Sequence, residues 1–518
     1  MPTTAIIGAG PSGLAAARWL EKEGFEPILF ERGDRVGGQW TGDARYSGVW
    51  PSMRTNTSHM MTAFSDLAYP LGTSVYPSNQ AVCAYLQRYA EQFDLLPRVR
   101  LRTEVREIAR ARSGFVVRST NGDGARREET YSNVVVATGR YRTPAIPAVP
   151  GLSSFSGRGG VAHTFQYKDT ERYRGLRVLV GGCSISALEI ASDLAMTGAA
   201  RVISTNRRQR YVIQKIIAGV PTDHLAFTRF GALAAESLPG EVVARNLKEF
   251  ITRTSGRPEQ YGAPKPADDV FEAGIAPCQH FLPLVAEGRI AIRPWMTGID
   301  GRTVRFADGS SEEVDAVIFG TGYDLDLPFL SEDIRRTLDV DNRHIDLHEL
   351  TFHPDLPGFA FVGIHPQLGP YFPSVELQAR WIAYAWSGAR PAPSREEMEA
   401  GLARYRARRG GPQDVPLHVA AIRFARGAGV EPDAERWPGL ARALLFGPLS
   451  AISFRLSGPD SLPDAPRRTA EVAASQGAVP TPELTPDQRA QLQTLVAARG
   501  DASLARVLEG LTAPGAVA

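Results

Sequence analysis

The chain has 518 residues, more than one hydrophobic core usually organises, so we expect two or three domains. Its 58 Lys and Arg residues nearly balance 56 Asp and Glu residues, and the charges are scattered, which argues against a nucleic-acid partner. The three cysteines lie far apart and form no CxxC pair, so we expect no disulfide framework, no metal site and a reducing, cytoplasmic location.

The N-terminus leaves no room for a signal peptide, because a glycine-rich motif already begins at Gly8. The longest late apolar run, residues 443–454, is short and contains Pro448. The sequence therefore predicts no transmembrane segment.

The first predicted unit begins with a buried strand at residues 3–7, a turn at 8–13, a helix at 14–24 and a second strand at 26–31. The turn carries the motif GxGxxG. The first glycine permits the turn, the second lets the backbone approach a pyrophosphate, and the third lets the helix pack on the strand. The motif residues expected to bind the dinucleotide are Gly8, Gly10, Pro11, Ser12 and Gly13.

Glu31 ends the second strand, 23 positions after Gly8, where a carboxylate can accept hydrogen bonds from both ribose hydroxyls. The following RGDRVGGQW segment favours FAD over NAD. Gly37 and Gly38 allow a compact loop along the phosphates, and Gln39 and Trp40 follow it. Trp40 is expected beside the isoalloxazine, with an ordinary core position as the alternative.

An apolar strand within residues 133–139 closes the first unit, with Thr138 and Gly139 in its terminal turn. The proline-rich residues 144–150 are predicted to form a stiff linker. A second unit then repeats the pattern, with a strand and turn at 176–182, a helix at 186–198 and a strand at 200–205. Residues 315–322 close it, with Thr321 and Gly322 in the turn.

The second glycine motif departs from the ideal, because Ser184 replaces its middle glycine and Ala187 its third. Gly182, Ser184, Ser186 and Ala187 are still expected to approach a pyrophosphate, since these residues are small.

The position that corresponds to Glu31 is Thr205, so no carboxylate stands there to repel a phosphate. Arg207 and Arg208 follow, beside the hydroxyls of Ser204 and Thr205. Paired guanidinium groups suit a ribose 2′-phosphate, which predicts NADPH rather than NADH. The alternative is a pair of solvated surface arginines.

These patterns predict an α/β fold with two Rossmann-like domains. The FAD-binding domain comprises residues 1–150 and 323–388, because residues 357–370 read as a strand and a helix start that return to the first unit. Residues 151–322 form the NADPH-binding domain. The Arg-, Ala- and Pro-rich residues 389–518 are predicted to form a helical C-terminal extension.

From about residue 3 to residue 385, the chain resembles the class B flavin-containing monooxygenases. ATGRYRTPAIPAVPG is similar to the family's first domain-crossing segment, and FGTGYD to its FATGY segment, with Gly320 in place of Ala. RTNTSHMMTAFSDLAYP resembles the stretch that carries the family's active-site Asn, here Asn56.

The family signature FxGxxxHxxx(Y/F) is nearly present, as Phe155, Gly157, His163 and Tyr167. His163 lies six residues after Gly157, where the family has four. Tyr167 favours the N- or S-oxygenating branch, because Baeyer–Villiger enzymes resemble one another in having Trp there. We expect His163 to be a hydrogen-bonded structural residue, because no carboxylate adjoins it.

The resemblance implies that NADPH reduces FAD, that dioxygen then forms a C4a-hydroperoxyflavin, and that a small nucleophile with a soft N or S centre attacks the distal oxygen. Asn56 is the expected catalytic amide, with a turn-forming role as the alternative. Asp66 is expected near the flavin, as a catalytic or turn-capping residue. Thr57 and Val105 are further expected FAD contacts.

Two other functions stay open. A Baeyer–Villiger monooxygenase would convert ketones to esters with the same cofactors, and a flavin-carrying regulatory or scaffold protein would have no oxygenase activity. A disulfide reductase is excluded because no redox CxxC follows the first unit. The expected partners are a small-molecule substrate, dioxygen and a second copy of the chain in a homodimer.

Overall fold

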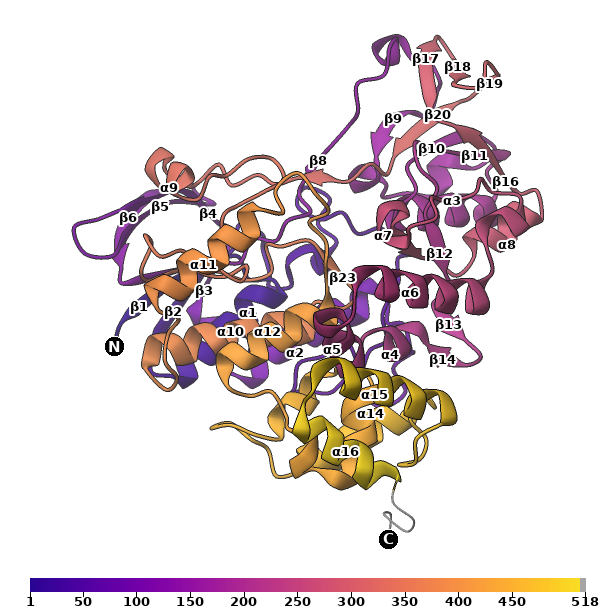
Figure 1. Ribbon diagram of the computed structural model, residues 1–518. Coiled ribbons are helices and arrows are strands. Elements are labelled where there is room, and N and C mark those ends of the chain that lie inside the picture. Colours follow the sequence, from indigo (N-terminus) through magenta and orange to yellow (C-terminus); the bar gives the residue numbers. More distant parts are fainter. Residues whose placement is uncertain (513–518) are drawn as a thin grey trace.

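Two five-stranded parallel sheets form the framework of the protein (Figure 1). The computed structural model describes residues 1–512. The first sheet contains, in order, β22 (Phe359–Phe361), β7 (Asn133–Val136), β1 (Thr3–Ile7), β2 (Glu26–Phe30) and β3 (Val99–Arg100). The second contains β16 (Ile290–Pro294), β11 (Arg201–Asn206), β10 (Arg177–Gly181), β20 (Ala316–Phe319) and β9 (Gly160–His163). The predicted α/β fold with two Rossmann-like units is confirmed.

The first sheet is buried on both faces, as parallel sheets usually are. In β1, Ile6 faces a core shared with α1, α10 and α12, whereas Ala5 and Ile7 face a core shared with an antiparallel sheet. Successive side chains of a strand point to opposite faces, which explains why all three residues are apolar. The elements that cover the sheet are α1 (Pro11–Lys22), α2 (Asn79–Gln92), α10 (Phe372–Ser387), α12 (Leu417–Ala428), β4 (Thr103–Arg110), β5 (Phe115–Asn121) and β6 (Arg126–Tyr131).

The second sheet repeats this arrangement. In β10, Val178 and Val180 face two helices, and Leu179 faces a three-stranded antiparallel sheet. These elements are α3 (Ile185–Thr197), α8 (Phe281–Ala286), β17 (Met296–Asp300), β18 (Thr303–Phe306) and β19 (Ser311–Glu313). The two units therefore place their first helices, α1 and α3, at equivalent positions after their first strands.

The chain crosses between the two sheets twice, and the crossing segments pair with each other. β8 (Thr143–Pro144) runs antiparallel to β21 (Tyr323–Asp324), and the amide of Ala145 donates to the carbonyl of Gly322 over 3.0 Å. The predicted linker at residues 144–150 is thus fastened at its start to the returning strand.

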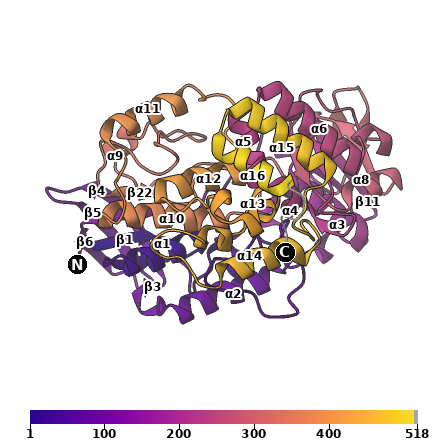
Figure 2. The same cartoon turned by 60° about the horizontal axis from the view of Figure 1, so that its bottom comes forward.

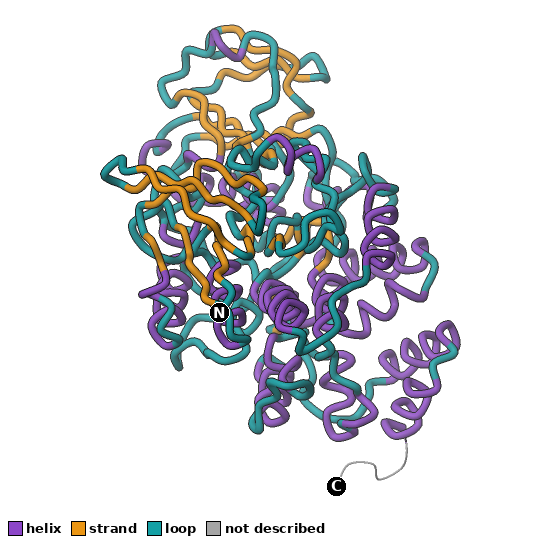
Figure 3. The backbone as a smooth tube through the Cα atoms, turned by 90° about the vertical axis from the view of Figure 1, so that its left-hand side faces the viewer, coloured by secondary structure: helices purple, strands orange, loops and turns teal. Residues whose placement is uncertain are grey.

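Helices dominate the remainder (Figure 3). One group lies between β11 and β16 and comprises α4 (Thr222–Ala226), α5 (Arg229–Ser237), α6 (Gly240–Ser255) and α7 (Val270–Ala273), with the short strands β12 (Tyr211–Ile213), β13 (Ile216–Ile217), β14 (Val220–Pro221) and β15 (Ile275–Pro277). The C-terminal group comprises α13 (Ala441–Phe446), α14 (Ala465–Ser475), α15 (Pro486–Arg499) and α16 (Ala502–Thr512). The two groups meet where α5 contacts α13 and α15 (Figure 2).

Residues 389–512, predicted as a helical extension, contain α11 (Arg395–Arg406), α12, α13 to α16 and the short strand β24 (Val415–Pro416), and residues 513–518 lie outside the described part. The extension contributes to two cores. Helix α12 packs in the core of the first sheet, whereas α13 to α16 share a core with Leu233 of α5. Within residues 1–512, no helix combines the length and apolar character needed to cross a bilayer.

Candidate active site

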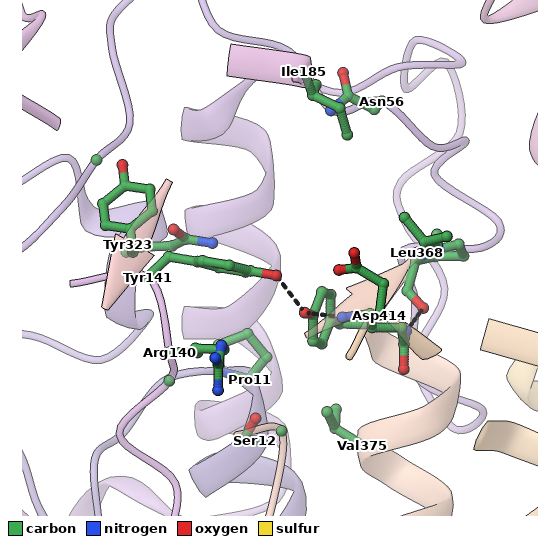
Figure 4. A pocket seen from close by; sticks show the side chains of 18 of the residues that line it. Pro11, Ser12, Asn56, Arg140, Tyr141, Ile185, Tyr323, Leu368, Val375 and Asp414 are labelled. Atoms are coloured by element: carbon green, nitrogen blue, oxygen red, sulfur yellow. Dashed lines mark hydrogen bonds between the residues drawn. The ribbon is translucent and has the colours of Figure 1, made fainter. Parts of the chain in front are cut away.

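A single cavity of about 1300 Å³ is lined by both Rossmann-like units. Pro11 and Ser12, at the start of α1, line it, as do Ile185 and Ser186, at the start of α3. In Figure 4, Asn56 lies beside Ile185, on the opposite side of the cavity from Pro11 and Ser12. Two helix N-termini, each a ready anion-binding position, therefore open into the same space.

The N-terminus of α1 presents uncapped backbone amides at the cavity. Its N-cap is Gly10, and no side chain caps the first amides. A Cβ on Gly13 would lie 1.9 Å from the carbonyl oxygen of Gly8, and one on Gly8 would lie 2.7 Å from that of Ala137. These glycines let the turn close tightly and leave the helix amides facing the cavity.

A second glycine loop packs directly on the first. Gly38, with a φ of +57°, begins the short 3₁₀ helix η1 (Gly38–Thr41), and a Cβ there would lie 2.9 Å from the Cα of Gly10. Gln39 and Trp40 follow it and line the cavity. The paired backbones form a cradle without side chains, which fits the pyrophosphate of FAD.

The carboxylate of Glu31 lies beside this cradle, against the first glycine turn. It accepts hydrogen bonds from the amides of Ala9 (2.9 Å) and Gly33 (2.8 Å), and it lines the cavity. Each carboxylate oxygen retains a lone pair, so both can still accept a bond from a ribose hydroxyl. The residues present therefore fit FAD.

The second motif shows how its departures from the ideal are accommodated. The N-cap of α3 is Ser184, and no side chain caps the helix. A Cβ on Gly320 would lie 2.6 Å from the Cβ of Ala187, and one on Gly182 would lie 2.3 Å from the carbonyl oxygen of Gly320. The methyl group of Ala187 thus occupies the space left by glycine at position 320, and the backbone turn is preserved.

The residues predicted to hold the 2′-phosphate lie at the end of β11. Ser204 and Thr205 are fully buried, and the hydroxyl of Thr205 donates to the carbonyl of Pro294 (2.5 Å). Arg207 and Arg208 are exposed, and the Arg207 guanidinium lies 4.7 Å from the centre of the Trp295 ring. The two arginines, rather than the two hydroxyls, are therefore the groups available to a phosphate.

Asn56 lies in a loop before α2 that reaches the cavity beside the start of α3. Thr55 and Ser58, on either side of it, are buried and hydrogen-bonded. The amide of Thr55 donates to the carbonyl of Pro77 (3.0 Å), and Ser58 donates from both its amide (2.8 Å) and its hydroxyl (2.9 Å) to Asp223. Asn56 itself is partly buried and lines the cavity, on a backbone that these hydrogen bonds hold.

Asp66 is in a different place from the one expected. It does not line the cavity, and its Oδ2 lies 3.7 Å from Nε of Arg18, on the middle of α1. Burial raises the pKa of its carboxyl, while the charges of Arg455 and Arg18 oppose that shift. Asp66 thus belongs to a buried ionic cluster, which argues against a catalytic role.

His163 is the buried structural residue that we expected. Its Nδ1 accepts a hydrogen bond from the amide of Phe165 (3.1 Å), and burial lowers its pKa to about 4, so it is neutral at physiological pH. The hydroxyl of Tyr167 donates to Asp193 (3.0 Å), and its ring is fully buried. Neither residue lines the cavity.

The cavity gathers most of the predicted site residues. Those that line it are Gly8, Gly10, Pro11, Ser12, Glu31, Gly38, Gln39, Trp40, Asn56, Thr57, Val105, Thr138, Gly139, Ser184, Ser186 and Gly322. Those that do not are Gly13, Asp66, Gly182, Ala187, Ser204, Thr205, Arg207, Arg208 and Thr321. Among these, Gly13, Gly182 and Ala187 act by permitting close packing, and the hydroxyl of Thr321 donates to the carbonyl of Ala145 (2.6 Å).

Sequence reasoning missed two features of the cavity. Tyr141 (Figure 4) and Tyr371 line it, with their hydroxyls 3.0 Å apart, and Asp223, which binds Ser58, lines it as well. Tyr141 lies two residues after Gly139 of the predicted turn, which is a local signal. Asp223 lies 165 positions after Ser58, so no local pattern connects them.

The chain matches a family model described as flavin-binding monooxygenase-like over residues 2–476. It is similar to the N-oxide-forming dimethylaniline monooxygenase 2 of Rattus norvegicus, with 32% identity over 483 residues and 88% coverage of each chain. Its structure is similar to that of S-allyl-L-cysteine S-oxygenase from Allium sativum (TM-score 0.62, 26% identity, 83% of this chain and 88% of the other).

The fold is also shared with cyclohexanone monooxygenase from Rhodococcus sp. Phi1, whose structure was solved with NADP⁺ (TM-score 0.61, 16% identity, 83% of this chain and 98% of the other). The match to the family model and the identity to the rat enzyme both extend over most of the chain. The protein is a monooxygenase that depends on FAD and NADPH, and it belongs to the flavin-binding monooxygenase-like family.

Proposed function

We propose that the protein oxygenates a soft nitrogen or sulfur centre of a small molecule. The observation that carries this proposal is the cavity into which both uncapped helix N-termini and Asn56 open. FAD, when bound, accepts hydride from NADPH and activates dioxygen. The substrate's own lone pair is the nucleophile, so no nucleophilic side chain is needed.

In this proposal the chain's residues bind, orient and shield the reactants. Glu31 holds the FAD ribose, and the amides at the start of α1 hold its pyrophosphate. The amides at the start of α3 hold the NADPH pyrophosphate. Asn56 donates an amide hydrogen bond toward the reacting atoms without releasing a proton. The enclosing walls keep bulk water away from this point.

Two comparisons support the N- or S-centre. The rat relative is named for N-oxide formation, and the garlic neighbour is named an S-oxygenase. Tyr167, at the end of the signature, agrees with this branch. The likeness to cyclohexanone monooxygenase is at 16% identity, which speaks for the fold and not for ketone chemistry.

A panel of three substrates tests the reaction class. With NADPH and oxygen, the holoenzyme is expected to convert dimethylaniline to its N-oxide and thioanisole to its sulfoxide, and to leave cyclohexanone unchanged, as measured by mass spectrometry. Conversion of cyclohexanone alone to its lactone would replace our proposal with the Baeyer–Villiger reaction. NADPH oxidation without any oxygenated product would contradict both.

We propose that Arg207 and Arg208 select NADPH. The double change Arg207→Ala with Arg208→Ala is expected to raise the KM for NADPH at least about 10- to 100-fold, because the loss of even one charge-assisted hydrogen bond to a phosphate costs roughly 1.5–3 kcal/mol. The KM for NADH should change little, since NADH has no 2′-phosphate. Steady-state NAD(P)H oxidation measures both values.

Arg126→Ala provides the matched control for this experiment. Arg126 is an exposed arginine on β6, in the first unit, so its removal lowers the net charge without touching β11. An equal rise in KM for NADPH and NADH in the double variant would contradict phosphate binding by the two arginines.

A further inference from the structure

A buried carboxyl group borders the cavity and is not part of either glycine motif. Asp223 is 4% exposed and lies at the start of α4, in the helical segment between β11 and β16. Its Oδ2 accepts two hydrogen bonds, both from Ser58. Within residues 1–512, its Oδ1 is buried without a hydrogen-bond partner. A buried carboxyl oxygen without a hydrogen-bond partner lowers the free energy of unfolding, so we expect a functional role for Asp223.

The contact with Ser58 links two distant parts of the chain. Ser58 lies two positions after Asn56 and is 1% exposed. On the other side of Asn56, Thr55 is held within its own loop by Pro77. Asp223 is therefore one of the residues that tie the Asn56 loop to the second unit, together with Asp193 of α3, which accepts from the Ser52 hydroxyl (3.0 Å), and Lys215, whose carbonyl accepts from the Tyr76 hydroxyl. Of these contacts, the one with Asp223 is the nearest to Asn56 in sequence.

The hydrogen bonds at Ser58 form a directed chain. The Ser58 hydroxyl lies 2.8 Å from Nε2 of His224 and donates to Asp223, so Nε2 of His224 is the donor to the hydroxyl. Burial lowers the pKa of His224 to about 4, which keeps its ring neutral. Both donors of this hydrogen-bond network, Nε2 of His224 and the hydroxyl of Ser58, thus point toward the carboxylate of Asp223.

We propose that Asp223 is the positioning residue of the catalytic loop: by gripping Ser58, its carboxylate fixes the amide of Asn56 at the junction of the two cofactor positions. This inference rests on the proposed role of Asn56 in oxygenation. Asp223 acts through Ser58 and needs no contact with the substrate. A displacement of about 1 Å at a reacting group costs roughly 100-fold in rate, so the grip has a catalytic consequence.

Few charges oppose or support the Asp223 carboxylate. The Lys215 ammonium forms an ion pair with the carboxylate of Glu189, at 3.5 Å. The hydroxyl of Tyr76 donates to the carbonyl of Lys215 and stays neutral, since burial raises its pKa. Ser58 and Tyr76 interact with the carboxylate of Asp223 directly, His224 contacts the hydroxyl of Ser58, and His59 interacts with His224.

Burial raises the pKa of Asp223 to about 6, while the hydrogen bonds from Ser58 oppose that shift. Below pH 6 the carboxyl is protonated and its grip on Ser58 weakens, because the bonds lose their charge assistance. Product formation is therefore expected to fall as the pH drops from 7.5 to 5. The folded pKa lies above the usual unfolded value of 3.8, so stability is lost as the pH rises between these values.

Substitutions of two matched serines test whether the hydrogen bonds between Ser58 and Asp223 position the loop. Ser65, in the same loop, donates its amide (2.7 Å) and its hydroxyl to the buried carboxylate of Glu376 but lies outside the cavity. Ser58→Ala is expected to lower kcat about 10-fold with little change in substrate KM, and Ser65→Ala to leave kcat within about twofold. Hydrogen–deuterium exchange of residues 54–62 in the holoenzyme should increase in Ser58→Ala only.

Asp223→Asn separates charge from shape. The amide keeps an acceptor for Ser58 but cannot titrate. The kcat of the variant should therefore not change near pH 6, and it should equal the kcat of the unsubstituted enzyme at pH 5, where the carboxyl is also neutral. Its unfolding temperature should exceed that of the unsubstituted enzyme by a margin that grows from pH 5 to pH 7, because a buried charge has been removed. A merely structural residue would lower stability and leave the pH profile in place.

The outcomes separate this inference from the proposed function. Equal losses of kcat in the two serine variants, or a pH limb that persists in Asp223→Asn, would overturn the positioning role. Unchanged exchange of residues 54–62 in Ser58→Ala would overturn it as well. If the unsubstituted enzyme forms no N-oxide or sulfoxide, the proposed function fails, whereas exchange and unfolding still report on the grip of Asp223.

Discussion

Gly13→Ala is expected to give a protein that does not retain FAD. The new Cβ would lie 1.9 Å from the carbonyl oxygen of Gly8 and 2.9 Å from its carbonyl carbon, far inside contact distance. Both atoms belong to the backbone, so no side-chain rotation relieves the clash. Helix α1 must move away from β1, which removes its N-terminal amides from the phosphate position. The measurement is the ratio of flavin to protein absorbance after purification.

Gly240→Ala is the control for this change. Gly240 begins α6, and a Cβ there meets nothing within 4 Å. This variant should bind FAD fully, because the change lies outside the glycine motifs and alanine favours a helix. Normal flavin content in Gly13→Ala would contradict the assignment of the first turn to the FAD pyrophosphate.

Asn56→Ala is expected to reduce oxygenated product about 100-fold, as is typical when one preorganised hydrogen-bond donor is removed from a site of developing charge. NADPH oxidation should continue, because the predicted cofactor contacts of Glu31, Arg207 and Arg208 are untouched. The ratio of product formed to NADPH consumed therefore measures the effect. FAD content should stay unchanged.

The control for Asn56 is another carboxamide. Gln80 is exposed on α2, just beyond the Asn56 loop, and Gln80→Ala should leave the product ratio within about twofold. If Asn56→Ala retains the product ratio of the unsubstituted enzyme, the amide has no part in oxygenation and the turn-forming alternative accounts for it.

The fold was largely predictable from local patterns. The glycine motifs lie between an apolar strand and a helix in both units, and this order is dictated by the tight turn that a phosphate requires. The strand at residues 359–361 was also predictable, because its apolar run and the following turn repeat the signals of the earlier strands. These features depend on short stretches of sequence.

The site was less predictable wherever it depends on distant partners. The methyl group of Ala187 and the missing side chain of Gly320 compensate each other, yet they look like two unrelated departures in the sequence. Asp66 sits in the expected loop, but it turns toward Arg18 because a buried carboxylate needs a cation. The link between Ser58 and Asp223 depends on the packing of both units.

The pairing of β7 with β22 has a consequence for protein synthesis. Val134, Val135 and Val136 form one ladder with β1 and another with residues 359–361, which leave the ribosome only after the entire second unit. Until then β7 is an apolar edge strand, able to pair with other nascent chains. The later unit can fold first, and slow translation of residues 137–358 should prolong the interval in which the nascent chain needs protection by chaperones.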